Sequence, residues 1–287
     1  MSIYKNKETK IAIQELYYEK LNSLKIEYQE IDVNTKYGRT RVIKTGKSNG
    51  TKIIVFHGMN TGAPVALEAI KELTDSYNIF AIDTIGQATQ SEETRLNIKD
   101  NSFALWADEV LEKLQIKTAN FIGVSYGGFI LQKLISHKPE RVSKCIFVVP
   151  AGLVDGAFFP SLTKVTFPLI KFLLTKNDNH LHNFLSKFIN EDDNFMFRLQ
   201  KAMLLGVKMD YRRPPILKIK DVMHFEKPVY LMTVDNDIFF PGNESIKKAQ
   251  NIFKNLQDIY ILENNKHMPN KKQYPEIQQK IREWISK

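Results

Sequence analysis

The chain has 287 residues, of which 43% are hydrophobic and 25% are charged; this composition predicts a large buried core and excludes a disordered protein. The formal net charge of +9 is not gathered in a dense basic stripe, so we expect a basic surface and no nucleic-acid partner. The chain has a single cysteine, Cys145, which excludes a disulfide within the chain. It has no apolar signal core at its start and no long apolar stretch free of charges, so we expect a cytoplasmic protein without stable membrane insertion.

Helical spacing of apolar residues predicts an amphipathic helix over about residues 7–24, and two extended stretches, 26–34 and 39–46, predict a hairpin. Short apolar runs then alternate with helical segments. The predicted strands are KIIVFHG, YNIFAID, ANFIGVS, KCIFVVP, PVYLMTV and DIYILE, and the predicted helices cover residues 64–75, 100–115, 126–138, 242–255 and 273–286. This alternation is typical of an α/β protein with a mostly parallel sheet covered by helices on both faces.

The interval from residue 151 to residue 222 interrupts the alternation. It has no buried-strand run but contains helical patches rich in phenylalanine and leucine. We therefore predict a core formed by residues 1–150 and 223–287, with residues 151–222 inserted as a helical cap over one end of the sheet. Phe158 and Phe159 are candidates for a substrate pocket, although the interior of the cap is the favoured place for most phenylalanines of this segment.

The cap segment also contains His180 and His182, in the sequence NDNHLH. On a helix this spacing points the two rings apart, so we interpret them as surface residues and expect no metal site.

The sequence GVSYG, residues 123–127, follows an apolar strand and opens a helix. A sharp strand-to-helix turn of this kind can present a serine as a nucleophile, with glycines where the turn is crowded. Ser125 is therefore the candidate nucleophile; the alternative is a tight glycine turn with an incidental serine.

A nucleophilic serine needs a histidine to take its proton and a carboxylate to orient that histidine. His267 follows the last predicted strand and is the candidate base, because His224 precedes the acid candidates. Asp237 is the preferred acid, in the loop DNDIFFPGN after the strand PVYLMTV. Asp235 in the same loop is its main rival, and Asp83 is a more distant one.

Acyl transfer also needs backbone N–H donors for the oxyanion. Tyr126, directly after the serine, and Met59, in the loop VFHGMN, are the candidates, with Asn60 as the alternative to Met59. His57 in the same loop is interpreted as a structural residue that shapes it.

Together, HGMN, GVSYGG, NDIFFP and NKHMPN resemble the oxyanion loop, nucleophile elbow, acid loop and histidine loop of the α/β-hydrolase superfamily, and most closely its capped, esterase-like members. The resemblance implies an eight-stranded, mainly parallel sheet, a cap inserted after the sixth strand, and a triad of Ser125, Asp237 and His267. Lys266 stands where the family commonly has glycine, and Ala88 also departs from the family's pattern.

The function implied by the resemblance is hydrolysis of carboxylic esters with small to medium apolar acyl groups, through an acyl-enzyme intermediate and without a cofactor. The expected partner is a small-molecule ester. Two alternatives remain open: cleavage of amides or carbon–carbon bonds by the same triad, and a weakly catalytic ligand receptor.

Overall fold

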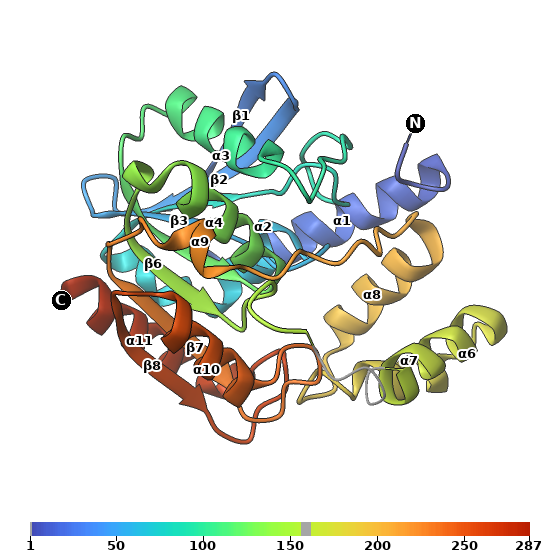
Figure 1. Ribbon diagram of the computed structural model, residues 1–287. Helices are drawn as coiled ribbons and strands as arrows, with labels where there is room; N and C mark the ends of the chain where they lie inside the picture. Colours follow the sequence, from blue (N-terminus) through green and yellow to red (C-terminus); the bar gives the residue numbers. More distant parts are fainter. Residues whose placement is uncertain (1, 156–161) are drawn as a thin grey trace.

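The computed structural model describes residues 2–155 and 162–287 and contains an eight-stranded sheet (Figure 1). Its strands are β1 (Tyr28–Thr35), β2 (Gly38–Gly46), β3 (Lys52–Phe56), β4 (Asn78–Ile82), β5 (Ala119–Val124), β6 (Val142–Val148), β7 (Val229–Val234) and β8 (Leu256–Leu262). Their order in the sheet is β1-β2-β4-β3-β5-β6-β7-β8. Strand β2 pairs antiparallel with β1 and β4, and all other neighbours are parallel. The α/β class, the hairpin and the six later strands predicted from the sequence are confirmed.

Helices cover both faces of the sheet. One face packs against α3 (Ser102–Lys113), α4 (Tyr126–His137), α9 (Ile219–Val222) and α10 (Gly242–Ile252). The other face packs against α1 (Lys7–Ser23), α2 (Gly62–Ala69) and α11 (Tyr274–Ser286). Because side chains alternate along a strand, each strand supplies apolar residues to both layers. The buried strands therefore read as continuous apolar runs in the sequence.

The predicted helix over residues 64–75 is wrong as a single element. The α-helix α2 ends at Ala69, and a separate 3₁₀ helix covers Lys71–Asp75. Between them Ile70 has φ −123° and ψ 17°, outside helical geometry, while its side chain stays buried. The apolar spacing carries on through this break, so periodicity alone does not reveal it.

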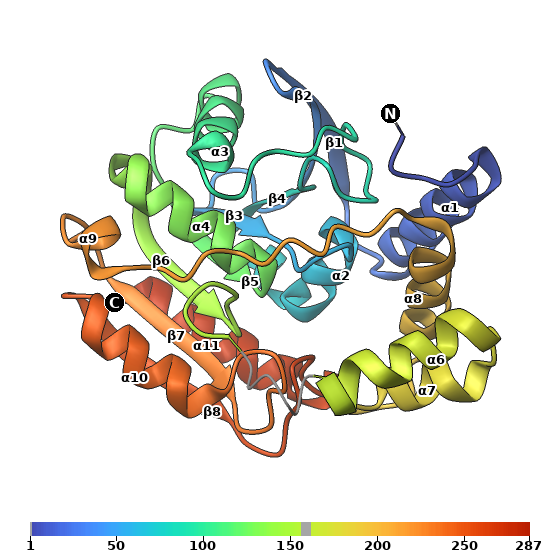
Figure 2. The ribbon, with the colours of Figure 1, turned by 45° about the vertical axis from the view of Figure 1, so that its right-hand side comes forward.

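Helices α6 (Phe167–Thr175), α7 (Asp178–Leu185) and α8 (Asn194–Gly206) lie between β6 and β7 in the chain, preceded by a π-helical turn at Leu162–Thr166. Figure 2 shows them gathered on one side of the molecule, next to α1. A third apolar cluster joins them to the N-terminal segment, with Ile13 and Leu16 of α1 and Leu199 and Met203 of α8 among its buried members. The inserted helices are therefore packed against the start of the chain and against residues of the loops that follow β7 and β8, Phe239 and Met268.

Candidate active site

Ser125 lies between the end of β5 and the start of α4, and its backbone has φ 50° and ψ −114°. A positive φ is costly for a residue with a side chain, so the surrounding structure must hold it. The Ser125 N–H donates to the Val148 carbonyl at 2.9 Å, and the Ser125 carbonyl accepts from the N–H groups of Gly128 and Ala151. These bonds fix the turn to the ends of β6 and α4.

The glycines around Ser125 are required by close packing. A Cβ atom on Gly123 would lie 2.8 Å from the Gly127 carbonyl oxygen, and one on Gly128 would lie 2.6 Å from Pro150 Cβ. A Cβ atom on Gly127 would overlap the Phe56 carbonyl of β3. Crowding thus explains the three glycines, but it does not require a serine at position 125.

The structure brings Ser125, His267 and Asp237 into one hydrogen-bonded chain. His267 Nε2 lies 2.9 Å from Ser125 Oγ, and His267 Nδ1 lies 2.7 Å from Asp237 Oδ2. The Asp237 side chain is fully buried, and that of His267 is 11% exposed. Because a carboxylate only accepts hydrogen bonds, Nδ1 donates to Asp237 and leaves Nε2 to accept from the serine hydroxyl.

Asp237 is held by its own loop. Its Oδ1 atom accepts from the backbone N–H groups of Phe239 and Phe240, at 2.8 and 3.0 Å. The rings of both phenylalanines lie edge-on to His267, with centroid distances of 5.1 and 5.4 Å. The two phenylalanines therefore orient the carboxylate through their backbones and confine the imidazole through their rings. The sequence interpretation gave them no role, although two aromatic residues just after an acid candidate were a usable signal.

The rival acids have other partners. Asp235 accepts from the backbone N–H groups of Asn264 and Asn265, at 2.8 and 2.9 Å. Burial opposes ionisation of Asp235, but these hydrogen bonds prevail and lower its pKa. Asp83 is completely buried, accepts from the N–H groups of Ala63 and Gln90, and has a pKa raised by burial. Within the described residues neither Asp235 nor Asp83 is hydrogen-bonded to His267, so Asp237 is the acid that the geometry favours.

The loop of residues 57–61 lies beside Ser125, because a Cβ atom on Gly58 would touch Ser125 Cβ at 3.6 Å. His57 Nε2 accepts from the Thr84 N–H at 2.9 Å, and the His57 side chain is fully buried. Burial lowers the pKa of His57, which favours the neutral ring that this acceptor role requires. His57 therefore shapes the loop, in agreement with its interpretation as a structural residue.

The two oxyanion candidates in this loop differ in their backbone contacts. The Asn60 N–H donates to Gln87 Oε1 at 2.6 Å, so it is already used within the protein. Met59 lines the cavity at Ser125, and within the described residues its backbone N–H has no hydrogen-bond acceptor. This contrast favours Met59 over Asn60 as the partner of Tyr126. Gln87, which sequence reasoning missed, fixes the turn at Asn60, where φ is 53°.

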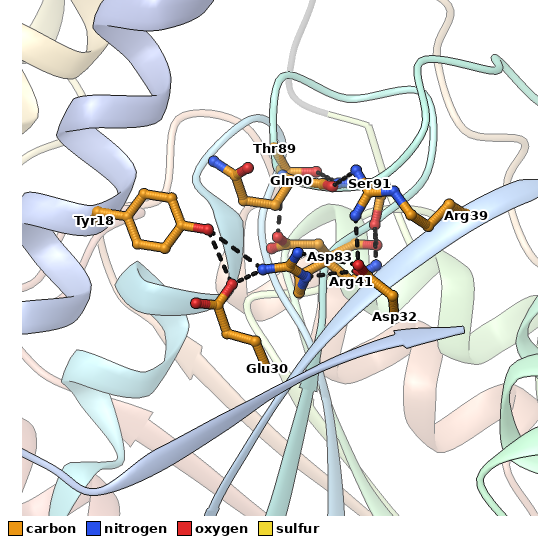
Figure 3. Close-up of polar contacts among 9 residues, drawn as sticks. All are labelled: Tyr18, Glu30, Asp32, Arg39, Arg41, Asp83, Thr89, Gln90 and Ser91. Atoms are coloured by element: carbon orange, nitrogen blue, oxygen red, sulfur yellow. Dashed lines mark hydrogen bonds and ion pairs between the residues drawn. The ribbon is translucent and has the colours of Figure 1, made fainter. Parts of the chain in front are cut away.

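The segment from Asp83 to Ser91, which carries Gln87, is anchored to the edge of the sheet (Figure 3). Ser91 Oγ donates to the Asp83 carbonyl and accepts from the Arg41 N–H, while the Gln90 carbonyl accepts from Arg39 Nη2. The side chains of both arginines bind Asp32 of β1. The hairpin β1–β2 thus supports, through this segment, the loop beside the serine.

The insertion between β6 and β7 holds the histidine loop. Lys266 Nζ donates to the carbonyls of Ser186 and Ile189, and the Lys266 N–H donates to Asn190 Oδ1. Asn190 Nδ2 in turn donates to the Met268 carbonyl at 3.1 Å. Lys266 occupies the position where the sequence resemblance suggested glycine, and these contacts explain what its long side chain does.

A cavity of about 380 Å³ opens at Ser125 and His267 and is lined mainly by hydrocarbon side chains. Phe158 and Phe159, the predicted pocket residues, lie outside the described residues. Within the described ranges, no cluster of three or more His, Cys, Asp or Glu side chains is placed to hold a metal ion. The site therefore combines a polar hydrogen-bonded chain with an apolar cavity.

A family model described as the alpha/beta hydrolase fold matches residues 52–214. The chain belongs to the α/β-hydrolase family. Two proteins of Bacillus subtilis (strain 168) are similar to it along almost its whole length. The carboxylesterase YbfK is 21% identical, and the alignment covers 96% of this chain and 93% of YbfK. The uncharacterized carboxylesterase nap is 20% identical, and the alignment covers 94% of this chain and 91% of nap.

Two crystal structures of Bacillus subtilis esterases share the fold of this α/β-hydrolase. Naproxen esterase (carboxylesterase NP) superposes with a TM-score of 0.85 at 16% identity, covering 98% of this chain and 99% of that one. The carboxylesterase CesB (YbfK) gives a TM-score of 0.83 at 17% identity, covering 97% and 98%. The predicted family and fold are thus confirmed.

Gln87→Ala removes the acceptor of the Asn60 N–H, so we expect the loop beside Ser125 to lose its fixed shape. Turnover of an acetyl ester should fall roughly tenfold, because a small displacement of the groups beside Ser125 slows the reaction. Steady-state kinetics checks this. Gln90→Ala in the same segment is the matched control, because the backbone contacts of Gln90 remain and its buried Nε2 has no hydrogen-bond partner in the described structure. Equal losses in both variants would contradict a specific role for Gln87.

Lys266→Met removes the side-chain bonds to Ser186 and Ile189 while keeping a long apolar stem. We expect kcat to fall roughly tenfold with little change in KM, because a small displacement of His267 weakens proton transfer. Lys272→Met, at an exposed position on the same connection, should behave like the wild type. Full activity of the Lys266 variant would show that the position of His267 does not depend on the side-chain bonds of Lys266.

Proposed function

We propose that the protein is a carboxylesterase that works through a serine nucleophile and an acyl-enzyme intermediate. Ester hydrolysis is supported by the two Bacillus subtilis carboxylesterases with which nearly the whole chain aligns. The serine mechanism is supported by the hydrogen-bonded chain from Ser125 through His267 to Asp237. That chain is the single observation that carries the mechanism, because it joins a nucleophile, a base and an orienting carboxylate in the required sequence.

In this mechanism Ser125 Oγ attacks the ester carbonyl while His267 Nε2 takes the hydroxyl proton. Asp237 keeps the other ring nitrogen protonated and stabilises the imidazolium that forms. The backbone N–H groups of Met59 and Tyr126 donate to the developing oxyanion. His267 then gives its proton to the leaving alcohol, and water attacks the acyl-enzyme by the same steps to release the acid. The residues named here carry the reaction without a cofactor.

The proposed substrates are small-molecule esters with small to medium apolar acyl groups, since the cavity at Ser125 is largely apolar. We assign residues 1–150 and 223–287 to the catalytic core and residues 151–222 to a cap that forms part of the cavity wall. We further propose a cytoplasmic location and no nucleic-acid partner. None of the described helices has the length and apolar character needed to cross a membrane.

Labelling with a fluorophosphonate, followed by mapping of the modified residue, tests the nucleophile. We expect labelling at Ser125 in the folded protein, and Ser125→Ala should lose both labelling and hydrolysis of p-nitrophenyl acetate. The loss should reach several orders of magnitude, since the remaining groups only bind and polarise the substrate. Full ester turnover by Ser125→Ala would refute the mechanism, whereas labelling of Ser125 without turnover of any ester, amide or diketone would favour a receptor.

Asp237→Asn tests the acid against its neighbour. We expect kcat to fall by about three orders of magnitude, because an amide can no longer hold His267 in the required tautomer. Asp235→Asn, two residues away, should stay within about threefold of wild type, since an asparagine oxygen can keep one of the backbone hydrogen bonds. The reverse pattern would transfer the role to Asp235.

A further inference from the structure

The cavity at Ser125 continues into the protein interior, between the sheet and two helices. Below the serine it is lined by side chains of β3, β5, α2 and α11, which include Val55, Ile122, Ala66, Ala69, Ile277 and Ile281. These residues belong to the apolar layer between the sheet and the helices α1, α2 and α11. One part of the cavity therefore runs within the core, and the inserted helices form only part of its wall.

The depth of this channel follows from the positions of its lining residues along regular elements. Ile122 lies three residues before Ser125 on β5, which corresponds to about 10 Å along a strand. On α11, Tyr274 and Ile281 both line the cavity and are seven residues apart, again about 10 Å along the helix. The strand and the helix thus give the same span for the lining residues. Ile281 has no exposed surface, so it closes the inner end of the channel.

Small residues on α2 leave room for the channel. Ala66 and Ala69 lie on the same face of the helix, three residues apart, and both line the cavity. A larger side chain at either position would extend into the space facing Ile122 and Ile281, which are themselves buried. The width of the channel therefore depends on two alanines that can be changed without touching the hydrogen-bonded chain at Ser125.

The six lining residues named above carry only hydrocarbon side chains, so the channel suits an apolar, uncharged group. A saturated carbon chain with bonds of about 1.5 Å and tetrahedral angles advances about 1.25 Å per carbon. A lining span of about 10 Å, closed by the fully buried Ile281, therefore sets an upper length of about eight carbons for a straight chain. Building on the proposed function, we propose that this channel binds the acyl part of the ester as a straight chain of up to about octanoyl length, with its tail directed towards Ile281.

The leaving alcohol has a different location in this arrangement. Residues of the insertion, Phe188, Gln200 and Met209, line the cavity on the side away from the core channel, together with Met268 of the histidine loop. Ser125 lies at the end of β5, between these two sets of residues. An ester bound at Ser125 therefore has its acyl part in the core channel and its alcohol part against the insertion. Acyl-chain length should then be sensed by α2 and α11, and the alcohol by the insertion.

Two ester series test the assignment: p-nitrophenyl esters from acetate to palmitate, and acetates of straight alcohols of increasing length. We expect kcat/KM in the acyl series to peak above butyrate and no later than octanoate. Ala66→Leu should lower the octanoate-to-butyrate ratio of kcat/KM by about fourfold for each methylene that it excludes. Ala69→Leu, one turn deeper, should do so less, and neither should alter the alcohol series. The proposal would be overturned if Ala66→Leu altered kcat/KM only in the alcohol series, or in neither series.

Enlarging the channel gives an independent test. Ile281→Ala removes the side chain at its inner end, so the optimum should move to longer acyl chains. Ile285→Ala is the matched control, because Ile285 lies one turn further along α11 in the same buried layer and is not among the cavity-lining residues. Both changes destabilise the fold by leaving a cavity, but only the first should shift chain preference. Equal profiles for the two variants would contradict the channel's position.

A binding measurement separates this inference from the catalytic proposal. Titration calorimetry of octanoate and butyrate with the Ser125→Ala protein should show tighter binding of octanoate, and Ala66→Leu in that background should abolish the difference. Octanoate binding without ester turnover by the wild type would refute the proposed function and keep the channel. Ester turnover at Ser125 with no preference for octanoate in either assay would refute the channel alone.

Discussion

The close approach of α4 to β3 at Gly127 is the constraint on which the site depends. A side chain at this position would overlap the Phe56 carbonyl, so the helix can start directly above the sheet only with glycine there. The chain must then reverse within the single residue Ser125, which takes a positive φ. Strain of this kind costs about 1–3 kcal/mol, and the backbone bonds to Val148, Gly128 and Ala151 offset it. A fixed hydroxyl at the strand ends is the result.

The groups around that hydroxyl are positioned from separate parts of the chain. Backbone N–H groups of its own loop hold Asp237, whereas the insertion holds the histidine loop through Lys266. The loop of Met59 depends on Gln87, and the segment around Gln87 depends on arginines of β2. Distances near 3 Å between Ser125, His267 and Asp237 thus rest on contacts far from the serine. Residues remote from the reacting atoms can therefore affect turnover without touching substrate.

Features encoded over a few neighbouring residues were predictable from the sequence. The buried strands are continuous apolar runs, and the glycines of the elbow have fixed offsets around Ser125. Features decided by distant contacts were less accessible. The sequence favoured Asp237 but left Asp235, two residues away, as a rival, and only their partners distinguish them. The contact of Gln87 with Asn60 spans 27 residues and has no local signal. The end of helix α2 before Ile70 was also not predicted, because the side chain of Ile70 stays buried although the helix has ended.

An ion-pair network connects the insertion, the histidine loop and the channel wall. Glu68 of α2 binds Lys20 of α1 at 2.8 Å and Lys271 at 3.1 Å, and Lys271 also binds Asp193, which caps the start of α8. Burial opposes the charge on Lys271, yet its acidic partners prevail and raise its pKa. Removing one partner would leave charge uncompensated near Lys20, whose side chain is only 7% exposed. Displacing α8 would therefore also disturb α2, which bears Ala66 and Ala69. The inserted helices and the wall of the channel are thus joined by ion pairs through Lys271 and Glu68.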